Sequence, residues 1–271
     1  MSTASATATP APMQLDISGT ARVPMSRLAK IEMRKALDTR AGRWLVIGIL
    51  GLVVVIEVIY AFAAHDGDKD LQDFIQIPGA VLGYFLPIVV IMLVTSEASQ
   101  RNGLVTFTLE PRRPRIVVAK FLAGIGLALG VMVLAVLLAV LGTLLGILTG
   151  GDPSWSLDGN LVFSALFLST MIGIFVGFAL SMLIMNTAGA IVAYFAYTLI
   201  LPTAVSLLSL LSDTFENIAP WIEFNTAQTP LISSPYSPTG EEWAQIATAG
   251  AIWLLLPLAL GIWRLLRIEF K

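Results

Sequence analysis

Apolar residues in this chain fall into six long runs that are separated by shorter polar segments. A helix that crosses a bilayer needs about 20 mainly apolar residues, and each run reaches that length. The runs lack the strict apolar–polar alternation of barrel strands, so they predict helices. We therefore expect an all-α integral membrane protein whose six-span domain covers residues 44–271. The expected spans are Leu45–Ala64, Ile77–Ser96, Phe121–Leu148, Leu161–Ile184, Ala188–Leu211 and Ala244–Leu266.

Two further segments precede the first span. Residues 1–23 are small, polar and Pro-containing, which predicts a disordered tail rather than a signal peptide. Residues 24–43 predict an amphipathic helix in the membrane interface, because apolar and mainly basic residues fall on opposite sides of a helical wheel. A solvated helix that merely precedes the span is the alternative. The apolar side holds Met25, Leu28, Ala29, Met33, Ala36 and Leu37, and the polar side holds Arg27, Lys30, Arg34 and Asp38.

The composition removes several classes of chemistry. The chain has 271 residues, of which 56% are hydrophobic and 13% charged, whereas a soluble domain has about 25% charged residues. It has no cysteine, and His65 is its single histidine. Neither the phosphate-binding G-x-x-x-x-G-K-S/T motif nor the zinc-protease H-E-x-x-H motif occurs. We therefore expect no catalytic residues, no metal and no cofactor in this chain.

The basic residues give the orientation. With six spans, every Lys and Arg except Lys69 falls on one side of the membrane. Acidic residues dominate the other side, in the loop after the first span and in the long outer segment 212–243. Lys and Arg are retained in cytoplasmic loops, so both termini are predicted to be cytoplasmic.

Polar residues inside the predicted spans are few. Glu57 in the first span is a candidate for the transport pathway, because an acid within the bilayer faces a partner or a cavity. A structural hydrogen bond, or a position near the outer interface, explains it equally well. Glycines spaced four residues apart favour close contact between helices. Such pairs are Gly126 and Gly130, Gly142 and Gly146, and Gly173 and Gly177.

The most densely charged polar insertion in the hydrophobic body is residues 97–120, between the second and third spans. Its first part is expected to form a short amphipathic helix, and Pro111 and Pro114 then break the chain. One interpretation is a helix that sits in a groove of a soluble partner, with Glu and Arg side chains fixing its register. The other is an ordinary basic loop that is cytoplasmic by topology alone.

The order of residues in this segment resembles the membrane-spanning permeases of ABC transporters of the second exporter type. The matching positions are Glu97, Arg101, Gly103, Thr106, Leu109, Pro111, Arg115 and Lys120. The amphipathic helix, the six spans and the long outer segment match the organisation of that family along nearly the whole chain. Family members often have consecutive Gly and Thr where this chain has Gly103-Leu-Val-Thr106.

The resemblance implies a bacterial inner-membrane exporter in which two copies of this chain assemble with two ATP-binding subunits. ATP and Mg would be bound by those partners, and no nucleic acid is involved. The residues expected to couple to the ATP-binding subunit are Glu97, Gln100, Arg101, Thr106, Phe107, Leu109, Arg112, Arg113 and Arg34. The alternatives are a gradient-driven carrier, a membrane-embedded enzyme and a regulator that transports nothing. The apolar spans favour an amphipathic or lipid-linked substrate, whereas the acidic outer loops also suit cationic cargo.

Overall fold

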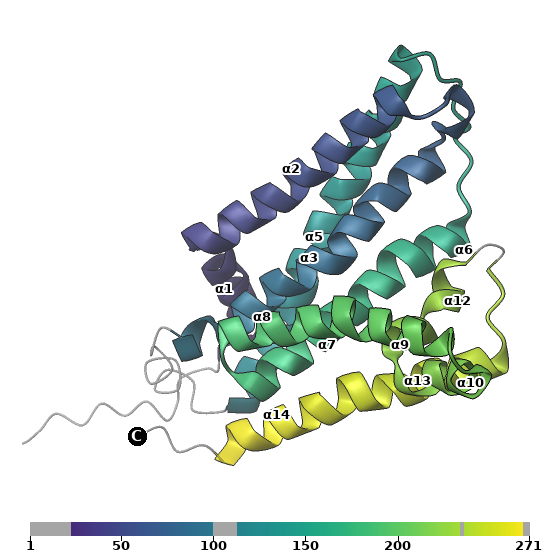
Figure 1. The fold of residues 1–271 in the computed structure, drawn as a ribbon. Coiled ribbons are helices and arrows are strands. Elements are labelled where there is room, and N and C mark those ends of the chain that lie inside the picture. Colours follow the sequence, from purple (N-terminus) through teal and green to yellow (C-terminus); the bar gives the residue numbers. More distant parts are fainter. Residues whose placement is uncertain (1–22, 100–112, 234–235, 268–271) are drawn as a thin grey trace, which may run out of the picture.

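The computed structural model describes residues 23–99, 113–233 and 236–267, which form helices joined by short loops (Figure 1). The long elements are α1 (Met25–Asp38), α2 (Arg40–Ala63), α3 (Leu71–Ser99), α5 (Arg113–Leu148), α7 (Ser169–Ile184), α8 (Thr187–Phe195), α9 (Leu201–Ser209), α10 (Asp213–Ile222), α13 (Gly240–Gly250) and α14 (Leu256–Arg267). The short ones are η1 (Asp66–Asp68), α6 (Gly159–Leu161), η2 (Val162–Leu168), η3 (Ala196–Ile200), α11 (Phe224–Ala227), α12 (Thr229–Ile232) and η4 (Ala251–Leu255).

Six helical stretches are long and apolar enough to cross a membrane, which confirms the predicted number. They are Arg40–Ala63, Leu71–Ser96, Pro114–Leu148, Val162–Ile184, Thr187–Ser209 and Gly240–Leu265. Several begin four to seven residues before the expected apolar run. The helix continues through polar residues there because its backbone hydrogen bonds do not depend on apolar side chains. The surface of these stretches is apolar, with exposed side chains such as Ile59, Val133 and Leu207.

The helices form two groups that share α3 (Figure 1). On one side α3 packs against α2 and α5, and on the other it packs against α7 and α8. Phe74 and Leu82 of α3 are fully buried in the first cluster of core residues, and Ile91 is fully buried in the second. Because α3 belongs to both groups, it provides the main packing contact between them.

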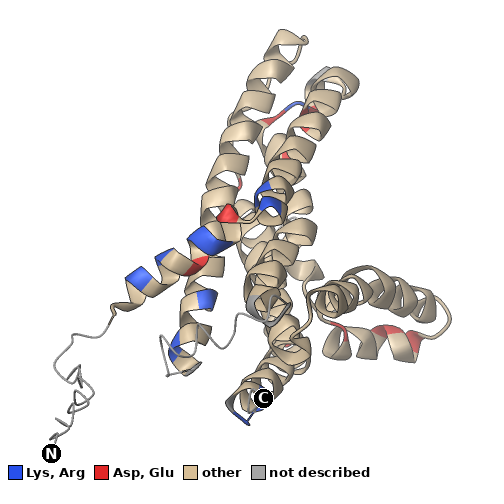
Figure 2. Cartoon of the chain, turned by 90° about the vertical axis from the view of Figure 1, so that its left-hand side faces the viewer, with Lys and Arg blue, Asp and Glu red and all other residues tan. Residues whose placement is uncertain are grey.

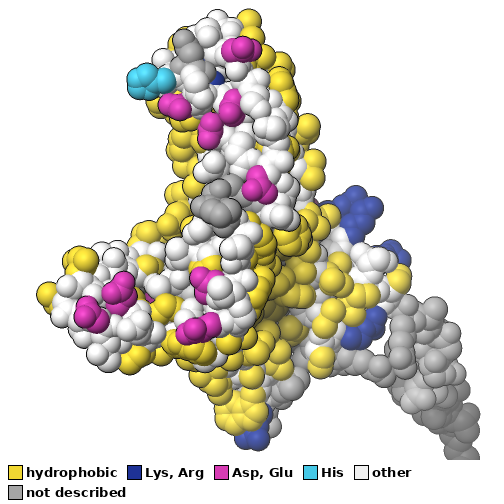
Figure 3. Space-filling model, turned by 90° about the vertical axis from the view of Figure 1, so that its right-hand side faces the viewer, with side chains coloured by type: hydrophobic (Ala, Val, Ile, Leu, Met, Phe, Trp, Pro, Cys, Tyr) yellow, Lys and Arg dark blue, Asp and Glu magenta, His cyan; other side chains and the backbone are white. Residues whose placement is uncertain are grey.

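Charge separates the two ends of the helices. Lys and Arg gather on α1, at the start of α5 and at the end of α14, which we call the basic end (Figure 2). Asp and Glu gather at the opposite end, over η1, the start of α3 and α10–α13, which we call the acidic end (Figure 3). The first and last described residues both lie at the basic end. That the basic end faces the cytoplasm stays a prediction.

Three of the spans contain a wide π-helical turn. The segments η3 and η4 each end just before a proline, Pro202 and Pro257 respectively. Proline has no backbone N–H and its ring collides with the carbonyl four residues earlier, so a wider turn accommodates it. Pro87, in contrast, lies inside the continuous helix α3. The backbone thus adjusts to proline differently in α3 and in the span that contains η3.

Candidate functional site

The segment between the second and third spans connects the end of α3 to the start of α5. Glu97 lies in the last turn of α3 and Arg113 is the first residue of α5, although their side chains are outside the described part. The other coupling residues predicted in this segment lie wholly outside the described residues. They are Gln100, Arg101, Thr106, Phe107, Leu109 and Arg112. The structure therefore describes the two helices that flank the segment.

A buried ion pair joins α1 to α5 beside this segment. Glu32 of α1 and Lys120 of α5 are only 6% and 5% exposed. The Lys120 ammonium donates to Glu32 Oε2 at 3.0 Å and also to the carbonyl of Leu93 in α3 at 3.3 Å. Lys35 Nζ lies 2.6 Å from Glu32 Oε1, so both carboxylate oxygens are paired. Three helices, α1, α3 and α5, thus meet at one set of charges.

Sequence reasoning missed Glu32. The residues of α1 that face the rest of the protein recur at helical spacing. Among the residues of α1, Glu32 alone is buried. Leu37, expected on the apolar side, is instead 39% exposed, and Arg34 is exposed as well. The signal that could have found Glu32 is its spacing of three, four and seven residues from Ala29, Leu28 and Met25, which places an acid in the middle of the apolar stripe.

A second contact ties the start of α1 to α5. The Arg115 guanidinium, one turn before Lys120, donates to the backbone carbonyl of Val23. The helix α1 is therefore held to α5 near both its beginning and its middle. A displacement of the start of α5 has to move α1 as well, because a buried charge pair is costly to separate.

Glu57 is buried in the other half of the membrane region, near the acidic end. Its side chain is 3% exposed, and Oε1 has no hydrogen-bond partner among the described residues. Gly142 of α5 leaves the room for it, since a Cβ added there would lie 3.3 Å from Glu57 Oε2 and 2.6 Å from Cδ1 of Phe74. The acid thus occupies a tight space between α2, α3 and α5.

The other predicted glycines differ in their surroundings. A Cβ on Gly177 of α7 would lie 3.0 Å from Cβ and 3.2 Å from the carbonyl oxygen of Pro87, so this glycine allows α7 to approach α3. Gly173 lies at the same crossing, where an added Cβ would be 3.3 Å from the carbonyl oxygen of Gly83. Gly126 faces the sulfur of Met33 at 3.7 Å, and Gly130 has open space around it.

We expect Gly177→Ala to destabilise the protein by about 1–3 kcal/mol, because the added methyl group forces the α3 backbone away. The matched change Gly130→Ala meets nothing within 4 Å. It should leave the stability unchanged or raise it slightly, because alanine favours a helix over glycine by about 1 kcal/mol. Thermal unfolding of both variants in detergent micelles measures the difference. Equal unfolding temperatures would contradict the close α3–α7 contact.

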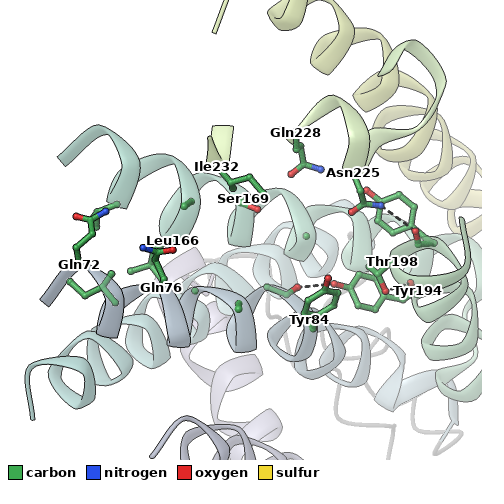
Figure 4. A pocket seen from close by; sticks show the side chains of 18 residues that line it. Gln72, Gln76, Tyr84, Leu166, Ser169, Tyr194, Thr198, Asn225, Gln228 and Ile232 are labelled. Atoms are coloured by element: carbon green, nitrogen blue, oxygen red, sulfur yellow. Dashed lines mark hydrogen bonds between the residues drawn. The ribbon is translucent and has the colours of Figure 1, made fainter. Parts of the chain in front are cut away.

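A cavity of about 420 Å³ opens between α3, η2–α7, η3 and the short helices α11 and α12 (Figure 4). It lies in the half of α3 nearer the acidic end, where Gly79, Ala80 and Gly83 provide space. Its volume is within the usual range of small-molecule sites. Two of the three π-helical segments, η2 and η3, contribute to its walls. Such turns occur frequently at functional sites.

Two polar side chains on the cavity wall, those of Asn225 and Tyr194, are held in place by hydrogen bonds. Asn225 Nδ2 donates to the carbonyl of Tyr197 at 3.2 Å and to Glu223 Oε1 at 2.9 Å. Glu223 itself is buried and caps the start of α11. Tyr194, which also lines the cavity, donates its hydroxyl hydrogen to the carbonyl of Gly83 at 2.9 Å and so joins α8 to α3. These hydrogen bonds fix the orientation of the Asn225 and Tyr194 side chains.

Among the described residues, no group of three or more His, Asp or Glu side chains could hold a metal ion. No protein-family model matches this chain, and no curated protein matches it either. Functional inference therefore depends on the resemblance in segment 97–120, the six spans, the ion pair at the basic end and the cavity near the acidic end.

Proposed function

We propose that this chain is the membrane-spanning permease subunit of an ATP-driven ABC exporter in a bacterial inner membrane. Two copies would form the translocation pathway and would bind two separate ATP-binding subunits that carry ATP and Mg. The observation that carries the proposal is segment 97–120, whose order of charged, Gly, Thr and Pro residues resembles the coupling element of that family. The six apolar helices and the basic end from which the segment emerges support it.

The contacts around Lys120 suggest how the coupling would work. Closure of the ATP-binding subunits moves segment 97–120, which is continuous with α3 and α5. Lys120 contacts both Glu32 of α1 and the carbonyl of Leu93 in α3, so the three helices move as a unit. Since α3 also packs against α7 and α8, the movement reaches the second group of helices. ATP acts here as a ligand that binds one of two conformations better.

Co-purification of this chain with a candidate ATP-binding subunit tests the proposal. We expect a complex that contains two copies of each subunit and hydrolyses ATP, and native mass spectrometry with an ATPase assay would measure both properties. The control is the ATP-binding subunit purified alone. A chain that purifies without any ATP-hydrolysing partner would exclude the proposal.

One observation favours a second candidate function, a gradient-driven carrier. The buried Glu57 has a carboxylate oxygen without a partner among the described residues, and an acid within a membrane is often a site of ion or proton exchange. The carrier predicts that Glu57→Gln abolishes gradient-dependent uptake in vesicles that contain this chain alone. Unchanged uptake, or no uptake by the unaltered chain, would remove this candidate.

A further inference from the structure

Three side chains on the wall of the cavity have unused hydrogen-bonding groups. Gln76 and Tyr84 of α3 and Ser169 of α7 make no side-chain hydrogen bond to any described residue. Tyr84 and Ser169 lie within the apolar part of their spans, where a polar group exposed to lipid is unfavourable. Gln76 is exposed near the start of α3, one residue before the apolar run that begins at Ile77. Figure 4 shows all three on the walls of one cavity, from two different helices. Groups of this kind are expected where a membrane protein receives a polar ligand or water.

The chemistry of the wall selects an uncharged ligand. The lining residues include amides and hydroxyls but no Asp, Glu, Lys, Arg or His. A charged ligand would lose its hydration here without gaining a counter-charge, which is strongly unfavourable. Glu223, which lies behind Asn225, has both carboxylate oxygens occupied by hydrogen bonds from Asn225 and Thr226. It is therefore engaged in holding α11.

Amides and hydroxyls both donate and accept hydrogen bonds, so they match a ligand whose hydroxyl groups do the same. Apolar side chains complete the wall, among them Ile75, Leu166 and Ile232, and these suit a hydrocarbon chain. The cavity is partly open, and Ile232 and Tyr84 at its wall are 55% and 45% exposed. A molecule could therefore enter with its head between α3 and α7 while its tail remains beside the helices.

We propose that this cavity binds a neutral amphiphile, with a hydroxyl-bearing head group at Gln76, Tyr84 and Ser169 and an alkyl chain along Ile75, Leu166 and Ile232. The identification of this amphiphile as the exported substrate rests on the proposed function. Its binding to the cavity does not. The position near the acidic end places the head group in the outer half of the membrane if the basic end is cytoplasmic. An exported amphiphile would leave from that half.

Photolabelling of the full chain in lipid nanodiscs tests the assignment. Three probes carry the same diazirine-bearing alkyl chain and differ only in the head group, which is glucose, trimethylammonium or phosphate. Mass spectrometry locates the labelled peptides. We expect the glucoside to label peptides of α3 and of η2–α7 at least fivefold more than either charged probe, and excess unlabelled alkyl glucoside to displace it. Equal labelling by all three probes would overturn the proposal.

Variants of Gln76 give a second test with a matched control. Gln76→Leu removes one amide from the wall, so glucoside labelling should fall about fivefold, as expected for one lost hydrogen bond. Gln245→Leu makes the same chemical change in α13, outside this cavity, and should leave the labelling unchanged. Gln76→Lys should reverse the preference and favour the phosphate probe, a gain that misfolding cannot produce. The proposal fails if Gln76→Leu labels like the unaltered chain.

The labelling uses no ATP-binding subunit, so it is independent of the co-purification. If the probes label as expected but no ATP-hydrolysing complex forms, the binding site is supported and the exporter function is excluded. If an active complex forms but the three probes label equally, the exporter function is supported and this binding site is excluded. Crosslinking of the cavity residues to a second copy, with no displaceable probe labelling, would assign the cavity to the interface between copies and also overturn the proposal.

Discussion

Lys120→Met is expected to destabilise this protein by about 3–5 kcal/mol, because it leaves the buried Glu32 carboxylate without its partner in α5. Lys120 is 5% exposed and lies 3.0 Å from Glu32 Oε2. Lys35 still pairs with Oε1 of Glu32 in this variant, so the loss falls on Oε2. Unfolding of the purified chain in mixed detergent micelles, followed by circular dichroism, measures the loss.

Two further variants separate the ion pair from other effects of this substitution. Lys30→Met makes the same change on the exposed side of α1, and its effect should stay within about 0.5 kcal/mol. Glu32→Leu combined with Lys120→Met removes both charges, so most of the stability should return. If the double variant were less stable than Lys120→Met alone, the buried pair would not be the cause.

Loss of coupling is the second large effect that we expect. In the assembled complex, Glu97→Ala combined with Arg101→Ala should lower substrate-stimulated ATPase activity and transport at least tenfold, which corresponds to about 1.4 kcal/mol of coupling free energy. The physical reason is that, under the proposed function, these charges would set the register of the segment in the groove of the ATP-binding subunit. ATPase assays and transport into inverted vesicles measure the two activities.

The control for this double variant keeps the same chemical changes but moves them away from the segment. Glu241→Ala at the acidic end, combined with Arg27→Ala on the exposed side of α1, should leave both activities near those of the unaltered complex. Full stimulated ATPase activity and transport in Glu97→Ala with Arg101→Ala would show that segment 97–120 does not couple the subunits. Segment 97–120 would then be basic for reasons of topology alone.

The sequence by itself determined the six helices. A segment that crosses a bilayer has to satisfy its backbone hydrogen bonds internally, so a run of about 20 apolar residues forms a helix whatever its neighbours are. The turn at Met185 and Asn186, between α7 and α8, also has a local cause. Met185 adopts a left-handed backbone with φ of 54°, and Asn186 caps the next helix by accepting from the Gly189 N–H at 2.9 Å.

Which faces of these helices meet was decided only by the tertiary structure. In water an apolar stripe marks the buried side of a helix, but in lipid every side is apolar and the pattern loses this information. Gly177 and Gly130 are therefore alike in the sequence, although one contacts Pro87 and the other has open space. Lys120, the partner of Glu32 on another helix, is 88 positions away in the chain. The cavity needs four segments to come together, so no single stretch of sequence predicts it.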